Sequence, residues 1–299
     1  MDFKKQYQIY LDKVNREIEK IYSVPELPQK SVFEAMEYGI AGGGKRIRPV
    51  LAMAVCHMLG GNVNDAARVG CAIESIHSYS LIHDDLPCMD DDDLRRGKPA
   101  CHKAYGEDIA LLAGDGLLNS AFEILSDSAA YENMGTKEIL AVIREVSTAS
   151  GALGMIGGQV IDLESEDRDD VSLEELCGLH KRKTGALIRV SAICGCLCAG
   201  ILDTNDEKYK KIVEFSEKIG LAFQIKDDIL DVIGEEELLG KPIGSDAEQN
   251  KNTFVTLMGL DGALGELTRL TTEAKQAIGE FEKNEFLLEF ANYLLNRNN

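Results

Sequence analysis

Apolar residues recur along most of this chain at the three- and four-residue intervals that place them on one face of an α-helix. Residues 3–18 show the pattern clearly. Sustained alternation of apolar and polar residues, which would indicate strands, is scarce, and the chain has no Trp. The pattern predicts helices over residues 3–22, 30–41, 49–59, 65–86, 107–129, 137–149, 151–164, 172–180, 184–200 and 206–233, with several more after residue 251.

Short breaks containing Gly or Pro separate these helices, at residues 23–29, 42–44 and 240–244 and around Pro87 and Pro99. None resembles a long Pro/Ser-rich linker, and no repeat of solenoid length is present. A chain of 299 residues can bury most of its apolar surface without a metal or disulfide to hold its core. We therefore predict an all-α fold, in which a large helical bundle occupies residues 1–299 as a single domain.

The segment GALIRVSAICGCLCAG (185–200) is apolar on most faces, which favours a central position in the domain or a place in a subunit interface. It contains Cys194, Cys196 and Cys198 at alternate positions. Paired C-x-x-C spacing, as in structural zinc sites, is absent from this segment. We expect buried free thiols, in agreement with a reducing compartment.

The chain is strongly acidic, with 32 Lys and Arg against 51 Asp and Glu and a formal charge of −19. This balance argues against general nucleic-acid binding and against docking on an anionic membrane. The N-terminus lacks an apolar signal core, and no apolar run reaches transmembrane length, so we expect a cytoplasmic protein without stable membrane insertion. Basic residues still cluster at 45–48, 94–98 and 181–183, as anion pockets or as solvated helix ends.

The most informative segment is SIHSYSLIHDDLPCMDDDDLRRGKPACH (75–102). An apolar helix runs into Asp84 and Asp85, Pro87 ends it, and Asp90 follows. Carboxylates at a helix C-terminus repel one another and the helix dipole, so a positive partner is expected. Their hard oxygens suit Mg²⁺, which commonly binds one or two carboxylates together with substrate phosphates. A solvated acidic loop is the alternative. A calcium EF-hand is excluded, because its alternating ligands, central Gly and final Glu are not in place.

A second acidic motif lies in GLAFQIKDDILDVIG (220–234). Asp227 and Asp231 are four residues apart and share a helical face, and Gln224 and Asp228 form another such pair. Three Asp residues among apolar neighbours are unfavourable in a helix interior without a specific role. A solvent-exposed face is the alternative. Two such helices facing each other could hold metal ions between them, with a diphosphate as the shared ligand.

DDLPCMD followed by DDLRRGKP, together with FQIKDDILD, resembles the two aspartate-rich motifs of the trans-prenyl diphosphate synthases, and most closely those of the bacterial farnesyl diphosphate synthases. Further family segments occur in order, namely GGGKRIRP (42–49), AGDGLL (113–118), GGQVIDL (157–163), KTG (183–185) and GKPIGSDAEQNKNT (240–253). The resemblance covers most of the chain. It implies a helical bundle of the isoprenoid synthase type with a central active-site cavity, several Mg²⁺ ions and a homodimer.

The resemblance also implies residue roles. The magnesium ligands would be Asp84, Asp85, Asp90, Asp227, Asp228 and Asp231. The allylic diphosphate would contact Arg95, Lys183 and Lys241, and the isopentenyl diphosphate would contact Lys45, Arg48, His77 and Arg96. Thr184 and Gln224 would line the carbocation site, and Lys251 would help to close the substrate pocket. Helix geometry supports one part of this set, because His77 lies seven residues before Asp84 and so shares its face.

The reaction implied is the head-to-tail condensation of isopentenyl diphosphate with dimethylallyl and geranyl diphosphate, giving farnesyl diphosphate. Product length would depend on the depth of the cavity beneath the first motif, where Ser80 lies four residues and Tyr79 five residues before Asp84. A bulky Tyr79 would obstruct a longer chain, as would suit farnesyl diphosphate. Ordinary packing is the alternative for Tyr79, and geranylgeranyl or geranyl diphosphate is the alternative product.

Two other classes of protein share some of these features. A class I terpene cyclase uses magnesium and a similar first motif, but its second motif is a mixture of Asn, Ser and Glu, whereas this chain has DDILD. A cyclase also has no need for the second anion pocket that the basic residues imply. A non-catalytic partner subunit would be free to lose metal ligands, and both acidic motifs are intact here.

Overall fold

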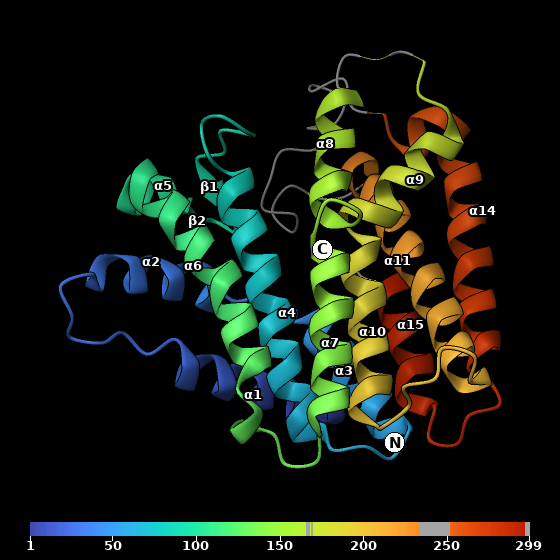
Figure 1. Ribbon diagram of the computed structural model, residues 1–299. Helices are drawn as coiled ribbons and strands as arrows, with labels where there is room; N and C mark the ends of the chain where they lie inside the picture. Colours follow the sequence, from blue (N-terminus) through green and yellow to red (C-terminus); the bar gives the residue numbers. More distant parts are fainter. Residues whose placement is uncertain (166–167, 169, 234–251, 297–299) are drawn as a thin grey trace. The chain divides into compact units, whose positions relative to one another are not determined.

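The computed structural model describes residues 1–165, 168, 170–233 and 252–296. In this part of the chain nearly all regular structure is helical (Figure 1), as the periodicity predicts. The chain divides into two compact units. The N-terminal unit comprises Asp2–Ile143 with Leu197–Gly200, and the C-terminal unit comprises Arg144–Cys196 and Ile201–Asn299 with Met1.

Helix α4 (Val63–Asp84) is central to the N-terminal unit, and most of its positions are buried. It packs against α1 (Phe3–Ile21), α2 (Lys30–Ala41), α3 (Ile47–Met58) and α6 (Glu107–Ser126). Asn62 caps its first turn, and it ends at the first aspartate pair, where Asp85 is the C-cap. The helix thus buries Tyr79, half-buries His77 and places Asp84 and Asp85 at its end.

A short hairpin follows this helix, with β1 (Leu94–Arg95) antiparallel to β2 (Lys98–Pro99). The turn residues Arg96 and Gly97 have φ of 55° and 75°, the backbone that a tight two-residue hairpin requires. Helical periodicity gives no signal for such two-residue strands, nor for the short helix α5 (Cys101–Tyr105) that comes next. The 3₁₀ turn η1 (Ser128–Ala130) separates α6 from α7 (Thr136–Ser150), which continues into the C-terminal unit.

The C-terminal unit contains α8 (Met155–Ser165), α9 (Leu173–Lys183), α10 (Gly185–Cys198), α11 (Glu207–Ile233), α14 (Phe254–Ala277) and α15 (Glu285–Asn296). Part of its core forms where α9, α11 and α14 meet, around Leu176, Ile225, Ile229 and Phe254. Ser172 and Thr253 each begin a helix with a reciprocal capping box. Cys194, Cys196 and Cys198 are buried thiols that form no disulfide bond, which confirms the sequence prediction.

Two helical stretches, Glu107–Ser126 and Thr136–Ser165, are long and apolar enough to cross a membrane by length and composition alone. That test also admits the core helices of soluble proteins. In α6 the side chains of Ala110, Ala113, Leu117 and Ala121 are buried within the N-terminal unit. We interpret α6 as a helix of the packed core of this unit.

Candidate functional site

The predicted site residues fall into two groups, one in each unit, and each group is described by itself. The N-terminal unit carries Lys45, Arg48, His77, Tyr79, Ser80, Asp84, Asp85, Asp90, Arg95 and Arg96. The C-terminal unit carries Lys183, Thr184, Gln224, Asp227, Asp228 and Asp231. Lys241 and Lys251 lie outside the described residues.

His77 marks the point where the basic segments of the N-terminal unit converge. Burial lowers the pKa of His77 well below its ordinary value, and the positive charges of Arg48 and Arg96 lower it further. Arg48 comes from α3 and Arg96 from the hairpin, so two segments far apart in sequence act on one imidazole. The histidine is therefore held neutral among cations, a setting in which it can donate a hydrogen bond to an anion.

The glycine-rich loop before α3 holds Arg96 in place. The Arg96 guanidinium donates to the carbonyl oxygen of Gly43. A Cβ on Gly44 would lie 3.0 Å from the Arg96 side chain, and Gly44 has a φ of 118° that side-chain-bearing residues rarely adopt. The loop sequence GGGKRIRP thus allows close approach of its backbone to an arginine that the hairpin presents.

Arg46, within the same basic run, has a structural role. It is 4% exposed, and its guanidinium donates to Glu74 (2.9 Å), to the carbonyl oxygen of Ile40 (2.7 Å) and to Asn15 (3.3 Å). The KRIR cluster is therefore divided. Arg46 ties α1, α2 and α4 together, and Lys45 and Arg48, on either side of it, stay the candidates for binding an anion.

At the end of α4 the first aspartate motif already has a cation. Arg95 binds both carboxylate oxygens of Asp85 through Nε, at 2.9 and 3.2 Å, and also contacts Asp92 at 3.4 Å. Burial raises the pKa of Asp85, although Arg95 works in the opposite direction. Burial also opposes the charge on Arg95, but the bond to Asp85 raises the pKa of Arg95 above its ordinary value. The positive partner that the sequence requires is thus supplied from within the same segment.

Asp84 and Asp90 are half-buried, whereas Asp85 is buried. The backbone N–H of Asp90 donates to the carbonyl oxygen of Asp84 (2.8 Å), which turns the loop back on the helix end. Within the part of the chain that the structure describes, no group of three or more His, Cys, Asp or Glu residues could hold a metal ion. The metal-ligand set stays a prediction.

Above this motif, α4 carries the two residues predicted to set product length. Tyr79 is 6% exposed, and its ring meets His83 edge to face at 5.7 Å between centroids. Its hydroxyl has no hydrogen-bond partner among the described residues, and burial raises its pKa to about 12. Ser80 is half-buried, and its hydroxyl donates to the carbonyl oxygen of His77 (3.0 Å). A large, neutral side chain therefore occupies the interior five residues before Asp84.

In the C-terminal unit, Lys183 forms an ion pair with Asp162 of α8. The two helices approach closely at this point, because a Cβ on Gly158 would lie 2.2 Å from the backbone nitrogen of Lys183. Only glycine fits there without moving one helix. The GGQVIDL segment thus contributes a glycine that admits α9 and a carboxylate that holds its lysine, neither of which its sequence motif alone reveals.

Thr184, Gln224 and Asp227 form a hydrogen-bonded series. The Thr184 hydroxyl donates to Gln224 Oε1 (3.0 Å), and Gln224 Nε2 donates to Asp227 (3.1 Å). The predicted carbocation residues are thereby linked to a predicted metal ligand.

Asp228 and Asp231 lie in a different environment from Asp227, because both are buried whereas Asp227 is half-buried. Asp228 accepts from the backbone N–H of Phe254 (2.7 Å), which places its carboxylate at the first turn of α14. This contact is a structural one, and it was not expected from the sequence.

A cavity of about 170 Å³, the α9 pocket, adjoins these groups. Its lining includes Asp162, His180, Lys183, Gln224 and Asp227. His180 stacks on Phe254 with 5.5 Å between centroids, and burial lowers its pKa to about 4. Sequence reasoning missed Asp162 and His180. The only available signal for His180 was its position three residues before Lys183, one helical turn away on the same face.

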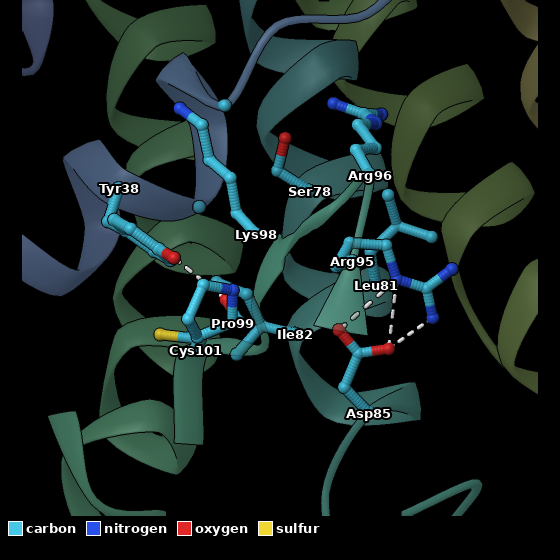
Figure 2. Close-up of a pocket in the computed structure, with 12 residues that line it drawn as sticks. Tyr38, Ser78, Leu81, Ile82, Asp85, Arg95, Arg96, Lys98, Pro99 and Cys101 are labelled. Carbon is cyan, nitrogen blue, oxygen red and sulfur yellow. Dashed lines mark hydrogen bonds and ion pairs between the residues drawn. The ribbon is translucent and has the colours of Figure 1, made fainter. Parts of the chain in front are cut away.

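The N-terminal unit has a smaller cavity of about 40 Å³, the hairpin pocket, lined by Tyr38, Ser78, Leu81, Ile82, Asp85, Arg95, Arg96, Lys98, Pro99 and Cys101, with Gly39 and Gly42 (Figure 2). Apolar side chains form its walls, and three basic side chains stand around it. Such a cavity is suited to a small ligand with an anionic head. Sequence reasoning missed Ser78, and it included Lys98 only as part of the basic run at residues 94–98.

Comparison with known proteins gives matches along nearly the whole chain. The model of the polyprenyl synthetase family matches residues 29–287. The farnesyl diphosphate synthase of Bacillus subtilis (strain 168) is 46% identical over 258 residues, 86% of each chain. The geranylgeranyl diphosphate synthase of Cyanophora paradoxa is 41% identical over 278 residues, 93% of this chain and 91% of the other. Among solved structures, an FPP/GFPP synthase from Zymomonas mobilis has a TM-score of 0.87 and 36% identity, covering 98% of this chain and 99% of the other.

Proposed function

Because the chain belongs to the polyprenyl synthetase family, and is therefore a prenyltransferase, we propose that it makes farnesyl diphosphate. It would join isopentenyl diphosphate head to tail to dimethylallyl diphosphate and then to geranyl diphosphate, releasing one diphosphate at each step. The observation that carries the proposal is that, in each unit, a cation predicted to bind the allylic diphosphate is held by an aspartate. Asp85 meets Arg95 in one unit, and Asp162 meets Lys183 in the other.

The family uses Mg²⁺ for catalysis, and its substrates are isopentenyl and allylic diphosphates. We propose that several Mg²⁺ ions bind here, held by Asp84, Asp85, Asp90 and Asp227, with Asp228 and Asp231 nearby. The donor chemistry fits, since all are hard carboxylate oxygens. Asp85 fits provided that Arg95 exchanges its carboxylate for a phosphate. When bound, the ions would neutralise the charge that builds on the departing diphosphate.

Different basic residues of the protein would bind the diphosphates of the two substrates. Arg95 and Lys183 would contact the allylic diphosphate, and His77 would donate to the isopentenyl diphosphate. The same anion would also meet Lys45, Arg48 and Arg96. Lys241 and Lys251 are proposed for the allylic diphosphate and for pocket closure on family resemblance alone.

Bond formation needs an allylic carbon that is electron-poor and shielded from water. The oxygens of Thr184 and Gln224 would stabilise positive charge on that carbon, because their dipoles are fixed by the bonds to each other and to Asp227. Exclusion of water would prevent hydrolysis of the cation. Cleavage of the allylic C–O bond would release diphosphate, the double bond of isopentenyl diphosphate would attack the allylic carbon, and the released diphosphate would take up the proton that the adduct loses.

Tyr79 would limit the product to fifteen carbons by standing where a longer chain would extend. Its burial and its contact with His83 support a fixed position. Geranylgeranyl diphosphate is the alternative product, since synthases of that compound are also among the relatives. Product length therefore needs to be measured.

We further propose that the two units act as one domain, that the chain forms a homodimer, and that it resides in the cytoplasm. For the homodimer, α6 leaves Leu111 and Leu112 47% and 53% exposed, an apolar surface that a second copy would cover. Sedimentation equilibrium would show a dimer, and Leu112→Lys should weaken it. A monomeric wild-type protein at micromolar concentration would contradict the homodimer.

The test of function is product analysis of the purified protein with Mg²⁺ and isopentenyl diphosphate, using dimethylallyl or geranyl diphosphate as the primer. A fifteen-carbon product from both primers is expected. A twenty-carbon product would keep the reaction and overturn the product length. Conversion of an allylic diphosphate alone would indicate a cyclase. Absence of condensation from folded protein would reject the proposal, and a parallel sample with EDTA tests the metal requirement.

A further inference from the structure

The hairpin pocket contains two polar side chains that the motifs leave without a role. Ser78 is on α4, six residues before Asp84. Lys98 is on β2, directly opposite Arg95 in the hairpin register.

Ser78 is 4% exposed, yet its hydroxyl makes no hydrogen bond with any described residue. Neighbouring serines on this helix differ, because Ser75 and Ser80 both donate to backbone carbonyl oxygens. Ser78 lines the hairpin pocket, and Figure 2 shows its oxygen turned toward the side to which the ends of Lys98 and Arg96 also point. The Ser78 hydroxyl is therefore available to donate a hydrogen bond to a ligand in this pocket.

Lys98, which is exposed, is the second of these side chains. It follows a run of four aspartates, Asp90–Asp93, but among the described residues it forms no ion pair. Its neighbours in the chain do pair, since Arg95 binds Asp85 and Lys103 binds Asp93 at 2.7 Å. A lysine amine that stays apart from nearby carboxylates, at the mouth of a cavity, can bind an external anion.

From this geometry we propose that Lys98 and Ser78 are substrate-binding residues, and that both donate to the diphosphate of the five-carbon substrate, isopentenyl diphosphate, beside Arg96. The assignment rests on the proposed function. In Figure 2 the Arg95–Asp85 pair lies away from the ends of Lys98 and Arg96, so the additional charge beside Arg96 comes from Lys98. The apolar walls at Leu81 and Ile82 suit a short hydrocarbon.

Steady-state kinetics in which isopentenyl diphosphate and the primer are varied separately test this proposal. Lys98→Met should raise the KM for isopentenyl diphosphate about tenfold, and Ser78→Ala about threefold. The KM for geranyl diphosphate and kcat should stay within about twofold of the wild type. Product length should not change. Lys98→Arg should restore most of the affinity. Lys30→Met is the matched control, because Lys30 pairs with Glu26 and Glu34 on the surface of the same unit.

Binding without turnover separates this proposal from the proposed function. Titration calorimetry with isopentenyl diphosphate alone should show weaker binding to Lys98→Met than to the wild type and to Lys30→Met. If the wild type makes no product but binds this ligand through Lys98, the proposed function fails and the site stands. Equal effects of Lys98→Met on both substrates, or no effect on either KM, would overturn the site.

Discussion

The buried ion pair between Arg46 and Glu74 gives the sharpest stability prediction. Both side chains are 3% exposed, so neither is screened by solvent. Arg46→Met would remove the bonds to Glu74, Ile40 and Asn15 together. It would also leave the Glu74 carboxylate without its cation, and Glu74 Oε2 already has no hydrogen-bond partner among the described residues.

The magnitude follows from that loss. Breaking a buried pair by removing one partner costs about 3–5 kcal/mol, because the other charge stays buried without compensation. Replacing both charged residues with apolar residues of similar volume costs far less unfolding free energy. Arg46→Met should therefore lower the free energy of unfolding by about 4 kcal/mol, whereas Arg46→Met with Glu74→Leu should lower it by only about 1 kcal/mol.

Urea denaturation of the wild type, of Arg46→Met, of Glu74→Leu and of the double variant gives a double-mutant cycle. Because each single variant leaves one buried charge without its partner, the double variant should lose several kcal/mol less than the sum of the two single variants. The KM for isopentenyl diphosphate should also rise in Arg46→Met, because Lys45 and Arg48 are neighbours of Arg46. Single-variant effects that simply add in the double variant would refute the reasoning.

Three further predictions follow from the site. Tyr79→Ala should lengthen the product by at least one isoprene unit, and unchanged products at normal activity would show that Tyr79 does not limit the chain. Gly158→Ala should reduce kcat/KM for the primer about tenfold or more by displacing Lys183, whereas Gly265→Ala, where a Cβ meets nothing within 4 Å, should not. Burial lowers the pKa of His180 to about 4, so between pH 6.5 and 4 only the unfolded chain gains its proton. Stability to urea should therefore fall as the pH is lowered through that range, and His180→Asn should flatten the fall; an unchanged slope would contradict it.

Much of the fold could be predicted from periodicity. The predicted helices at 30–41 and 206–233 agree closely with α2 and α11, because long amphipathic patterns bounded by Gly or Pro leave few alternatives. The hairpin could not be predicted in this way. Its strands have two residues each, and its turn depends on the positive φ of Arg96, which a sequence pattern does not reveal.

The site shows the same division. Charge and spacing identified Asp85, and the family resemblance identified Arg95, but only the three-dimensional structure shows that they neutralise each other. Within KRIR, three cations look alike in sequence, and burial alone distinguishes Arg46 as structural. Asp162 could not be found from spacing, because its partner Lys183 is 21 residues away on another helix.

The series Thr184–Gln224–Asp227 also fixes the orientation of the Gln224 amide and of the Thr184 hydroxyl. A carboxylate can only accept, so Asp227 must face the NH₂ of the Gln224 amide, and the amide oxygen is then turned toward Thr184. The Thr184 proton is thereby directed at that oxygen, and the lone pairs of its hydroxyl are left facing elsewhere. Asp227→Asn would remove this constraint, since an amide tolerates either orientation of its neighbour. Such a variant would lose a negative charge and, in addition, the defined orientation of the Thr184 hydroxyl.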